Sequence, residues 1–244
     1  MTSPSPRSWP ADYVRDPNNG PLPALLLILT ITTGIVDAVS ILSLGRVFVA
    51  NMTGNVVFIG FALAHAPGFS LLASLIALGA FLLGAAGGGL VVGRFARHRG
   101  RLLLTATAME LVLLLCAAIL LTAAAQPYRA AVGDLAVAAG ALALGLQNAA
   151  VRRLAVPDFT TTVLTMTLTG IAADLRQGNP RIAARRASSV VGMLLGAIVG
   201  AVLVLHGAAG IAMFTACALV AVVLAVLMAS VWHDAAWHHP KRDP

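Results

Sequence analysis

The chain has 244 residues, of which 59% are hydrophobic and only 10% are charged. Because soluble domains carry about 25% charged residues, this composition excludes an ordinary soluble protein and predicts an all-α polytopic membrane protein. The net charge of +7 does not indicate nucleic-acid binding. The arginines lie mainly in short loops, where they set topology and contact anionic lipid. The partner that composition predicts is therefore the lipid bilayer, and the many alanines and arginines suggest a GC-rich bacterial genome.

Polar segments occupy both ends of the chain. Residues 1–20 are polar and rich in proline, so we expect a disordered tail without an evident signal peptide, and residues 233–244 form a short polar tail. Between them lie apolar runs of about 20 residues, the length that crosses a hydrocarbon core of about 30 Å. The expected segments are 22–44, 48–66, 69–93, 102–125, 131–151, 159–175, 187–206 and 210–232. They form two sets of four, which predicts one membrane repeat over 21–126 and a second over 127–232.

Two polar strings interrupt these apolar segments at corresponding places. One runs from Gly34 to Asn55 and the other from Gly145 to Met166. When the two strings are aligned, Asp37 falls on Asn148, and a cluster of Asn and Thr falls on a cluster of Thr. A duplicated polar break in an apolar chain is typical of a binding site between two halves of a membrane protein.

The loop arginines predict the topology. One cluster lies between the third and fourth segments and another between the sixth and seventh: Arg94, Arg97, Arg99, Arg101, Arg176, Arg181, Arg185 and Arg186. Both loops should be cytoplasmic, but eight spanning segments would put them on opposite sides. The conflict disappears if 48–66 and 159–175 are re-entrant half-helices. Six spanning helices then form two inverted repeats with both termini cytoplasmic; the alternative is eight spans in parallel repeat.

Asp37 lies midway along the first apolar helix. A carboxylate at that depth costs several kcal/mol unless it is paired or faces water, so it is a candidate functional residue. One interpretation is that Asp37 couples a proton to transport, with Asn148 as a polar partner that cannot titrate. The other is that Asp37 only ties its helix to its neighbours.

The tips of the two re-entrant segments predict a substrate path. Asn and Thr are good N-caps, and two half-helix N-termini near the midplane favour an anion or the negative end of a polar solute. The alternative is that these side chains only satisfy buried backbone groups. Besides Asp37 and Asn148, the path residues are Asn51, Thr53, Gly54, Asn55, Thr161, Thr162 and Thr165.

Further residues have a possible role inside the membrane. Glu110 is a second candidate for a proton relay, or it pairs with a loop arginine or a Thr hydroxyl. Asp174 is expected to pair with Arg176 or the basic loop. Small residues at four-residue spacing let helices approach closely, and they could join the two halves or a homodimer. They are Gly84, Gly88, Gly89 and Gly93 in one segment, and Gly192, Gly196 and Gly200 in another.

Enzyme signatures are not found in the sequence. There is no His-Glu-x-x-His, Gly-x-Ser-x-Gly, Cys-x-x-Cys or Walker loop, so we expect no enzyme activity, no cofactor and no metal site. Cys116 and Cys217 are interpreted as small buried apolar residues.

The polar strings also carry a family resemblance. Gly34 to Ala38, the string Val-Phe-Val-Ala-Asn-Met-Thr-Gly-Asn over 47–55, and the run from Ala143 to Arg153 resemble the signature of the YoaK-like family. That resemblance covers nearly the whole chain and implies a multi-pass bacterial inner-membrane protein carrying a domain of unknown function. It brings no established substrate.

Two function classes follow. The leading hypothesis is a secondary transporter or channel for a small polar or anionic solute. The second is a membrane scaffold or assembly protein that transports nothing. An intramembrane lipid enzyme that uses Asp37 and Glu110 has little support, since no nucleophile or metal set accompanies them.

Overall fold

A computed structural model describes residues 16, 19–95, 97–156, 164–231 and 237, and every regular element in this part of the chain is a helix. The expected tails at 1–20 and 233–244 lie almost wholly outside the described residues. The helices are α2 (Leu22–Ser43), α3 (Met52–Leu63), α4 (Leu71–Phe95), α5 (Arg99–Ala123), α6 (Ala130–Leu154), α7 (Leu164–Arg176), α8 (Pro180–Leu205) and α9 (Ala209–Val231).

Helix length divides these elements into two classes. Six helices have 22 to 26 residues and are long and apolar enough to cross a membrane. In contrast, α3 has 12 residues and α7 has 13. At 1.5 Å per residue each is about 20 Å long or less, too short for a hydrocarbon core of about 30 Å. The prediction of a polytopic all-α protein is confirmed, and the two segments expected not to span contain the two short helices.

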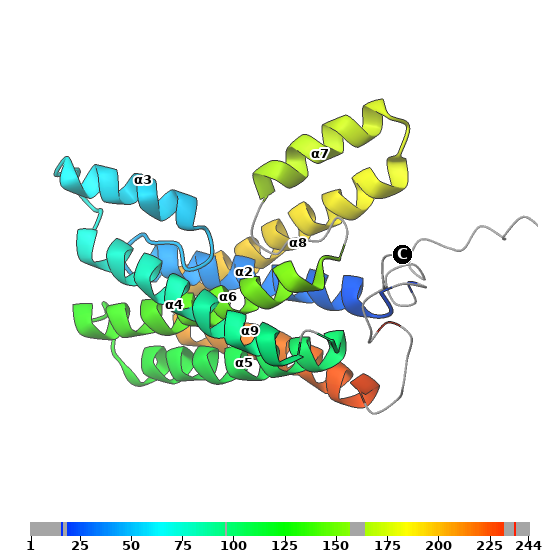
Figure 1. Cartoon of the computed structure of the whole chain (residues 1–244). Helices are drawn as coiled ribbons and strands as arrows, with labels where there is room; N and C mark the ends of the chain where they lie inside the picture. The colour runs from blue at the N-terminus through cyan, green and yellow to red at the C-terminus, as the bar shows by residue number, and fades with distance from the viewer. Residues whose placement is uncertain (1–15, 17–18, 96, 157–163, 232–236, 238–244) are drawn as a thin grey trace, which may run out of the picture.

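The long helices form a bundle with α2 and α6 innermost. Of the apolar stretch of α2, 72% is buried, against 17% for α4 and 28% for α8. In this bundle α4 packs against α6 as α8 packs against α2, and α5 packs against both α6 and α9. Figure 1 shows α3 and α7 on the same side of the bundle, near opposite ends. Each short helix packs mainly against the long helix that follows it.

Glycines bring α4 close to α6. A methyl group at Gly84 would overlap the carbonyl of Leu142, and one at Gly145 would overlap the carbonyl of Phe81. Such contacts between backbones require residues without a side chain. They explain why α4 and α6 share so long an interface.

The contact between α8 and α2 uses glycine in the same way. A methyl group at Gly196 would overlap the carbonyl of Ile31, and one at Gly34 would overlap the carbonyl of Met193. The glycine-rich segments therefore join helices of the same chain. Some outward-facing glycines on α4, namely Gly87, Gly89 and Gly93, have open space where a side chain would be.

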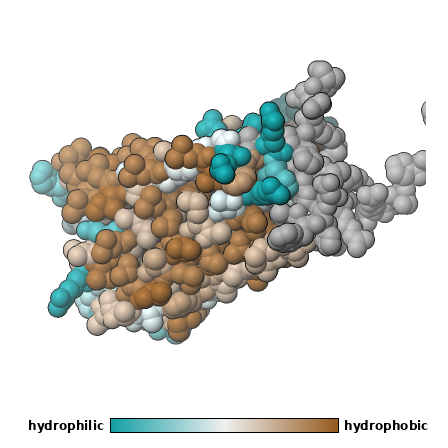
Figure 2. Space-filling view, turned by 60° about the horizontal axis from the view of Figure 1, so that its bottom comes forward, coloured by the Kyte–Doolittle hydropathy of each residue, from teal (hydrophilic) through white to brown (hydrophobic). Residues whose placement is uncertain are grey.

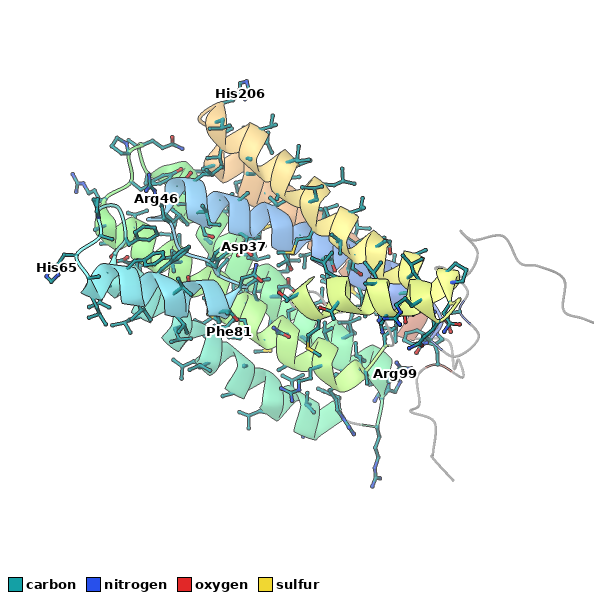
Figure 3. The ribbon with its side chains drawn as sticks, turned by 90° about the horizontal axis from the view of Figure 1, so that it is seen from above. Asp37, Arg46, His65, Phe81, Arg99 and His206 are labelled. Atoms are coloured by element: carbon teal, nitrogen blue, oxygen red, sulfur yellow. The ribbon has the colours of Figure 1, made fainter. Side chains whose placement is uncertain are left out.

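Both arginine-rich connections lie at one end of the bundle. Arg99, where α5 begins, donates to the Leu154 carbonyl at the end of α6 (2.8 Å) and to the Asn19 side chain before α2 (3.0 Å). At the same end Arg185 of α8 forms an ion pair with Asp16 at 3.4 Å. Figure 3 places Arg99 at the opposite end from Arg46, His65 and His206.

Apolar side chains cover much of the outer surface. Figure 2 shows a mainly hydrophobic face whose hydrophilic residues lie toward the two ends of the bundle. Leu83 and Leu90 of α4 and Leu194 of α8 are among the exposed residues, as a lipid-facing surface requires. Cys116 is also exposed, because it lies on the outer face of α5. The expectation that both cysteines are buried is correct only for Cys217.

Candidate functional site

Asp37 holds the loop that follows its own helix. One carboxylate oxygen accepts hydrogen bonds from the backbone N–H groups of Val49 (3.0 Å) and Ala50 (3.1 Å). The other accepts from the Asn51 side chain at 2.7 Å. Asp37 is only 4% exposed, so these bonds replace the water that its charge has lost.

These bonds fix how deeply the loop enters the bundle. Asp37 precedes Ser43, where α2 ends, by six residues, or about 9 Å of helix. The chain therefore turns back after α2 and descends beside it before α3 begins at Met52. Figure 3 shows Asp37 well inside the molecule, away from the end that carries Arg46 and His65. Irregular backbone at this depth is tolerated because its polar groups have partners in the protein.

Asn55 closes the same loop from the other side. Its amide oxygen accepts from the Phe48 N–H at 2.9 Å, and its amide nitrogen donates to the Phe48 carbonyl at 2.6 Å. The first half-helix was expected to begin near Asn51–Thr53, and α3 does begin at Met52 with Asn51 as its N-cap residue. The Asn51 side chain makes no cap hydrogen bond, however, because its amide is bound to Asp37. The first turn of α3 therefore has no side-chain cap.

Aromatic rings fasten α3 to its two connections. Phe48 in the entry loop stacks on Phe58 of α3 with ring centroids 5.6 Å apart, and Phe58 lies 5.0 Å from Phe69 in the loop before α4. Gly54 allows this arrangement, because a methyl group there would lie 2.5 Å from the Phe48 ring. Of the predicted path residues on α3, Asn55 is buried while Thr53 is exposed. The predicted path residues include none of these phenylalanines, although Phe48 lies within the first polar string and Phe58 lies three residues after it.

The second polar string is described only in part. Asn148 lies half-buried near the end of α6 and Thr165 is exposed in the first turn of α7. The predicted path residues Thr161 and Thr162 fall outside the described residues.

An ion pair fastens α7 to α8. Asp174 lies 2.9 Å from Arg186, whose guanidinium also covers Gly170 on the same face of α7. Arg186 belongs to the basic cluster that was one of the two expected partners of Asp174, so that expectation is confirmed, although Arg186 lies within α8 and the neighbouring Arg176 is not the partner. The spacing of Gly170 and Asp174, one helical turn apart, could have indicated a common contact.

Glu110 belongs to a different place in the bundle. It is fully buried on α5, and one of its carboxyl oxygens accepts from the Gln147 side chain of α6 at 3.0 Å. The expected partners, a loop arginine or a Thr hydroxyl, are not the ones observed. Gln147 lies in the second polar string beside Asn148, but the residue that aligns with Asp37 of the first string is Asn148.

Two surface hollows lie at opposite ends of the bundle, away from these residues. One is lined mainly by Arg94, Arg97, His98 and Arg101, and the other lies between the end of α5 and the start of α9. Within the described residues no group of three or more His, Cys, Asp or Glu side chains could hold a metal ion.

Comparison with known proteins decides the family. The family model for "Protein of unknown function (DUF1275)" matches residues 25–229, well over half of the chain. The chain belongs to this family. It is also similar to the UPF0700 transmembrane protein YoaK of Bacillus subtilis (strain 168), with 35% identity over 153 residues. That match covers 62% of this chain and 66% of the relative, just under two thirds. No solved structure matches the chain.

Membership of this family agrees with the resemblance carried by the polar strings. Together with the six apolar helices, the similarity to a transmembrane protein identifies the chain as a multi-pass membrane protein. The family's description names no activity, so the site itself must carry any argument about function.

Proposed function

We propose that this chain is a secondary transporter or channel for a small polar or anionic solute. The solute path runs between two four-helix halves, α2–α5 and α6–α9. The observation that carries the proposal is a short helix, α3, that begins inside the bundle after a loop held by Asp37. Half-length helices that begin at membrane depth are typical of transporter binding sites.

The partial positive charge at the N-terminus of α3 favours a solute with a negative end. The first N–H groups of a helix have no partner within it and carry a partial positive charge. No side chain caps this end of α3, since Asn51 is bound to Asp37. The Gly54 N–H already bonds to the Asn51 carbonyl at 3.0 Å, and a polar solute near Thr53, which is exposed in the first turn, would satisfy the remaining groups.

We further propose that the two halves are inverted repeats. Support comes from equivalent contacts: Gly84 meets Leu142 as Gly196 meets Ile31. The halves also carry α3 and α7 near opposite ends of the bundle (Figure 1). The end that gathers the arginines would face the bacterial cytoplasm, together with both termini.

The second candidate is a scaffold that transports nothing. It is favoured by the fact that Asp37 and Asn55 already use their side-chain groups to hold the loop. A homodimer through the glycine-rich helices has weaker support, since Gly84 and Gly196 are taken up by contacts within the chain. Both candidates assume a role without catalysis.

Cysteine accessibility separates a solute path from a scaffold. In a background with Cys116 and Cys217 replaced, Thr53→Cys should react with a membrane-impermeant thiol reagent in proteoliposomes. The matched control is Leu83→Cys. Leu83 is 69% exposed on α4, but a cysteine there would face lipid and should not react. Protection of both positions would contradict a water-filled path and favour the scaffold.

Transport itself needs a flux measurement. Wild-type proteoliposomes should pass at least one member of a panel of small neutral polar and anionic solutes, followed by light scattering as the vesicles swell. A bulky residue at the uncapped helix end, Thr53→Trp, should reduce this flux while Leu83→Trp leaves it unchanged. Equal flux in both variants would exclude the α3 terminus from the path.

A further inference from the structure

Glu110 is the most deeply buried acidic residue outside the loop site. It lies eleven residues into α5, about 16 Å from Arg99 at the start of that helix. Its side chain is 0% exposed. A charged carboxylate at such a depth costs several kcal/mol unless a partner neutralises it, so the groups around it decide its state.

Those groups are neutral: the Gln147 amide and the Thr107 hydroxyl can each donate and accept hydrogen bonds, but neither carries a charge. One oxygen of Glu110 accepts from the Gln147 amide nitrogen. The other oxygen of Glu110, the Gln147 amide oxygen and the Thr107 hydroxyl are all buried without a hydrogen-bond partner among the described residues. Thr107 lies one helical turn before Glu110, on the same face of α5. The cluster thus gathers oxygen atoms from two helices and lacks a positive charge.

The packed helices bring no basic residue to this level. From α6 the cluster receives Gln147, and from α9 the buried Cys217 lies within electrostatic reach of Glu110. The charged residues of α4 and α6 stand near helix ends: Arg94, Asp134, Arg152 and Arg153. Glu110 therefore has no ionic partner in the described part of its surroundings, in contrast to Asp174.

A proton neutralises the buried carboxylate of Glu110 better than a metal ion would. Calcium and magnesium take six or more oxygen ligands, whereas this cluster offers few free oxygens and the neighbouring helix carbonyls bond within their helices. One proton on the free oxygen of Glu110 neutralises the charge and turns that oxygen into a hydrogen-bond donor. Thr107 or Gln147 can then accept a hydrogen bond from it.

We propose that Glu110, Thr107 and Gln147 form a proton-binding site between α5 and α6, which takes up a proton from water and returns it. The role of this site in coupling a proton to transport rests on the proposed transport function. The site assigns proton coupling to Glu110 instead of Asp37. Asp37 is the weaker proton carrier, because both its oxygens accept hydrogen bonds that a proton would disturb. Glu110 keeps one oxygen free.

Infrared spectroscopy of the purified full-length protein tests the site directly. The wild type should show the carbonyl stretch of a buried protonated carboxylic acid at neutral pH, and this band should shift in deuterated buffer. Glu110→Gln should abolish the band, whereas the matched control Asp37→Asn should retain it. Gln147→Leu should shift the band by removing one hydrogen bond, and it provides the test if Glu110→Gln does not fold.

The outcomes separate this proposal from the transport function. A band that is missing from the wild type, or that survives Glu110→Gln, overturns the proton site. A band that never exchanges with deuterated buffer overturns uptake and release. If the band behaves as expected but no solute crosses proteoliposomes, the proton site stands and the transport proposal fails.

Discussion

Asp37 shows how a single acidic residue is accommodated inside a membrane bundle. Its charge is matched by two backbone N–H groups and one side-chain amide, all from the loop that follows α2. Charge-assisted bonds of this kind are roughly twice as strong as neutral ones. Asp37 therefore positions the start of α3, whatever further role it has.

The pairing of Asp37 with Asn51 can be tested by exchanging the two residues. In Asp37→Asn two amide groups would face each other as donors, and an unsatisfied buried group costs about 1–3 kcal/mol. Asn51→Asp alone would place two carboxylates together. The double exchange restores one donor and one acceptor, so it should be more stable than either single variant in thermal unfolding in detergent.

The outcome has a clear alternative. If the losses of the two single variants simply add in the double exchange, the side chains do not interact as a pair. Thr53→Asn is a suitable control, because Thr53 is exposed and has no part in this contact.

The glycines show what determines the packing of the helices. Gly84 and Gly196 each lie against a backbone carbonyl of the neighbouring helix, whereas Gly89 on the outer face of α4 lies against nothing. The same residue type therefore has two roles on α4. Only the neighbouring helix distinguishes them.

Alanine substitutions should reveal this difference. We expect Gly84→Ala and Gly196→Ala to lose about 1–3 kcal/mol, because overpacking forces the helices apart. Gly89→Ala should be neutral or gain up to about 1 kcal/mol, since alanine favours a helix over glycine. Thermal unfolding of the purified variants measures both effects. A similar loss in all three variants would point to helix propensity or lipid contact and not to helix packing.

The positions of the two short helices could be predicted from the sequence, but not all of the contacts that hold them to the rest of the bundle could be. Arginine positions indicated that 48–66 and 159–175 do not span, and they also indicated that Asp174 pairs with the basic cluster that contains Arg186. The aromatic contacts of Phe58 connect residues whose proximity no local pattern specifies. Such contacts depend on how the helices lie in three dimensions.

Orientation is a property of the whole molecule. The connection between α7 and α8 lies at the arginine-rich end, and the connection between α5 and α6 lies at the other. In a cysteine-free background, Gln177→Cys should react with an impermeant thiol reagent only after cells are permeabilised. Ala125→Cys should react in intact cells. The reverse pattern would overturn the cytoplasmic assignment, and labelling of both in intact cells would indicate mixed orientations.

The sequence by itself determined the class of protein and the approximate bounds of its helices. These depend on hydrophobicity and length, which act along the chain and can be read from it. It also located Asp37 and Glu110 as the unusual acidic residues within the apolar helices.

Only the tertiary structure decided what these residues contact. It assigned Asp37 to the loop of its own hairpin, Glu110 to Gln147, and the glycines to helix contacts within the chain. The physical reason is that a buried polar group is defined by its partners. The partners of Glu110 and of the glycines come from helices far apart in sequence, and those of Asp37 come from a loop that folds back beside its helix, so all of them become visible only in the packed structure.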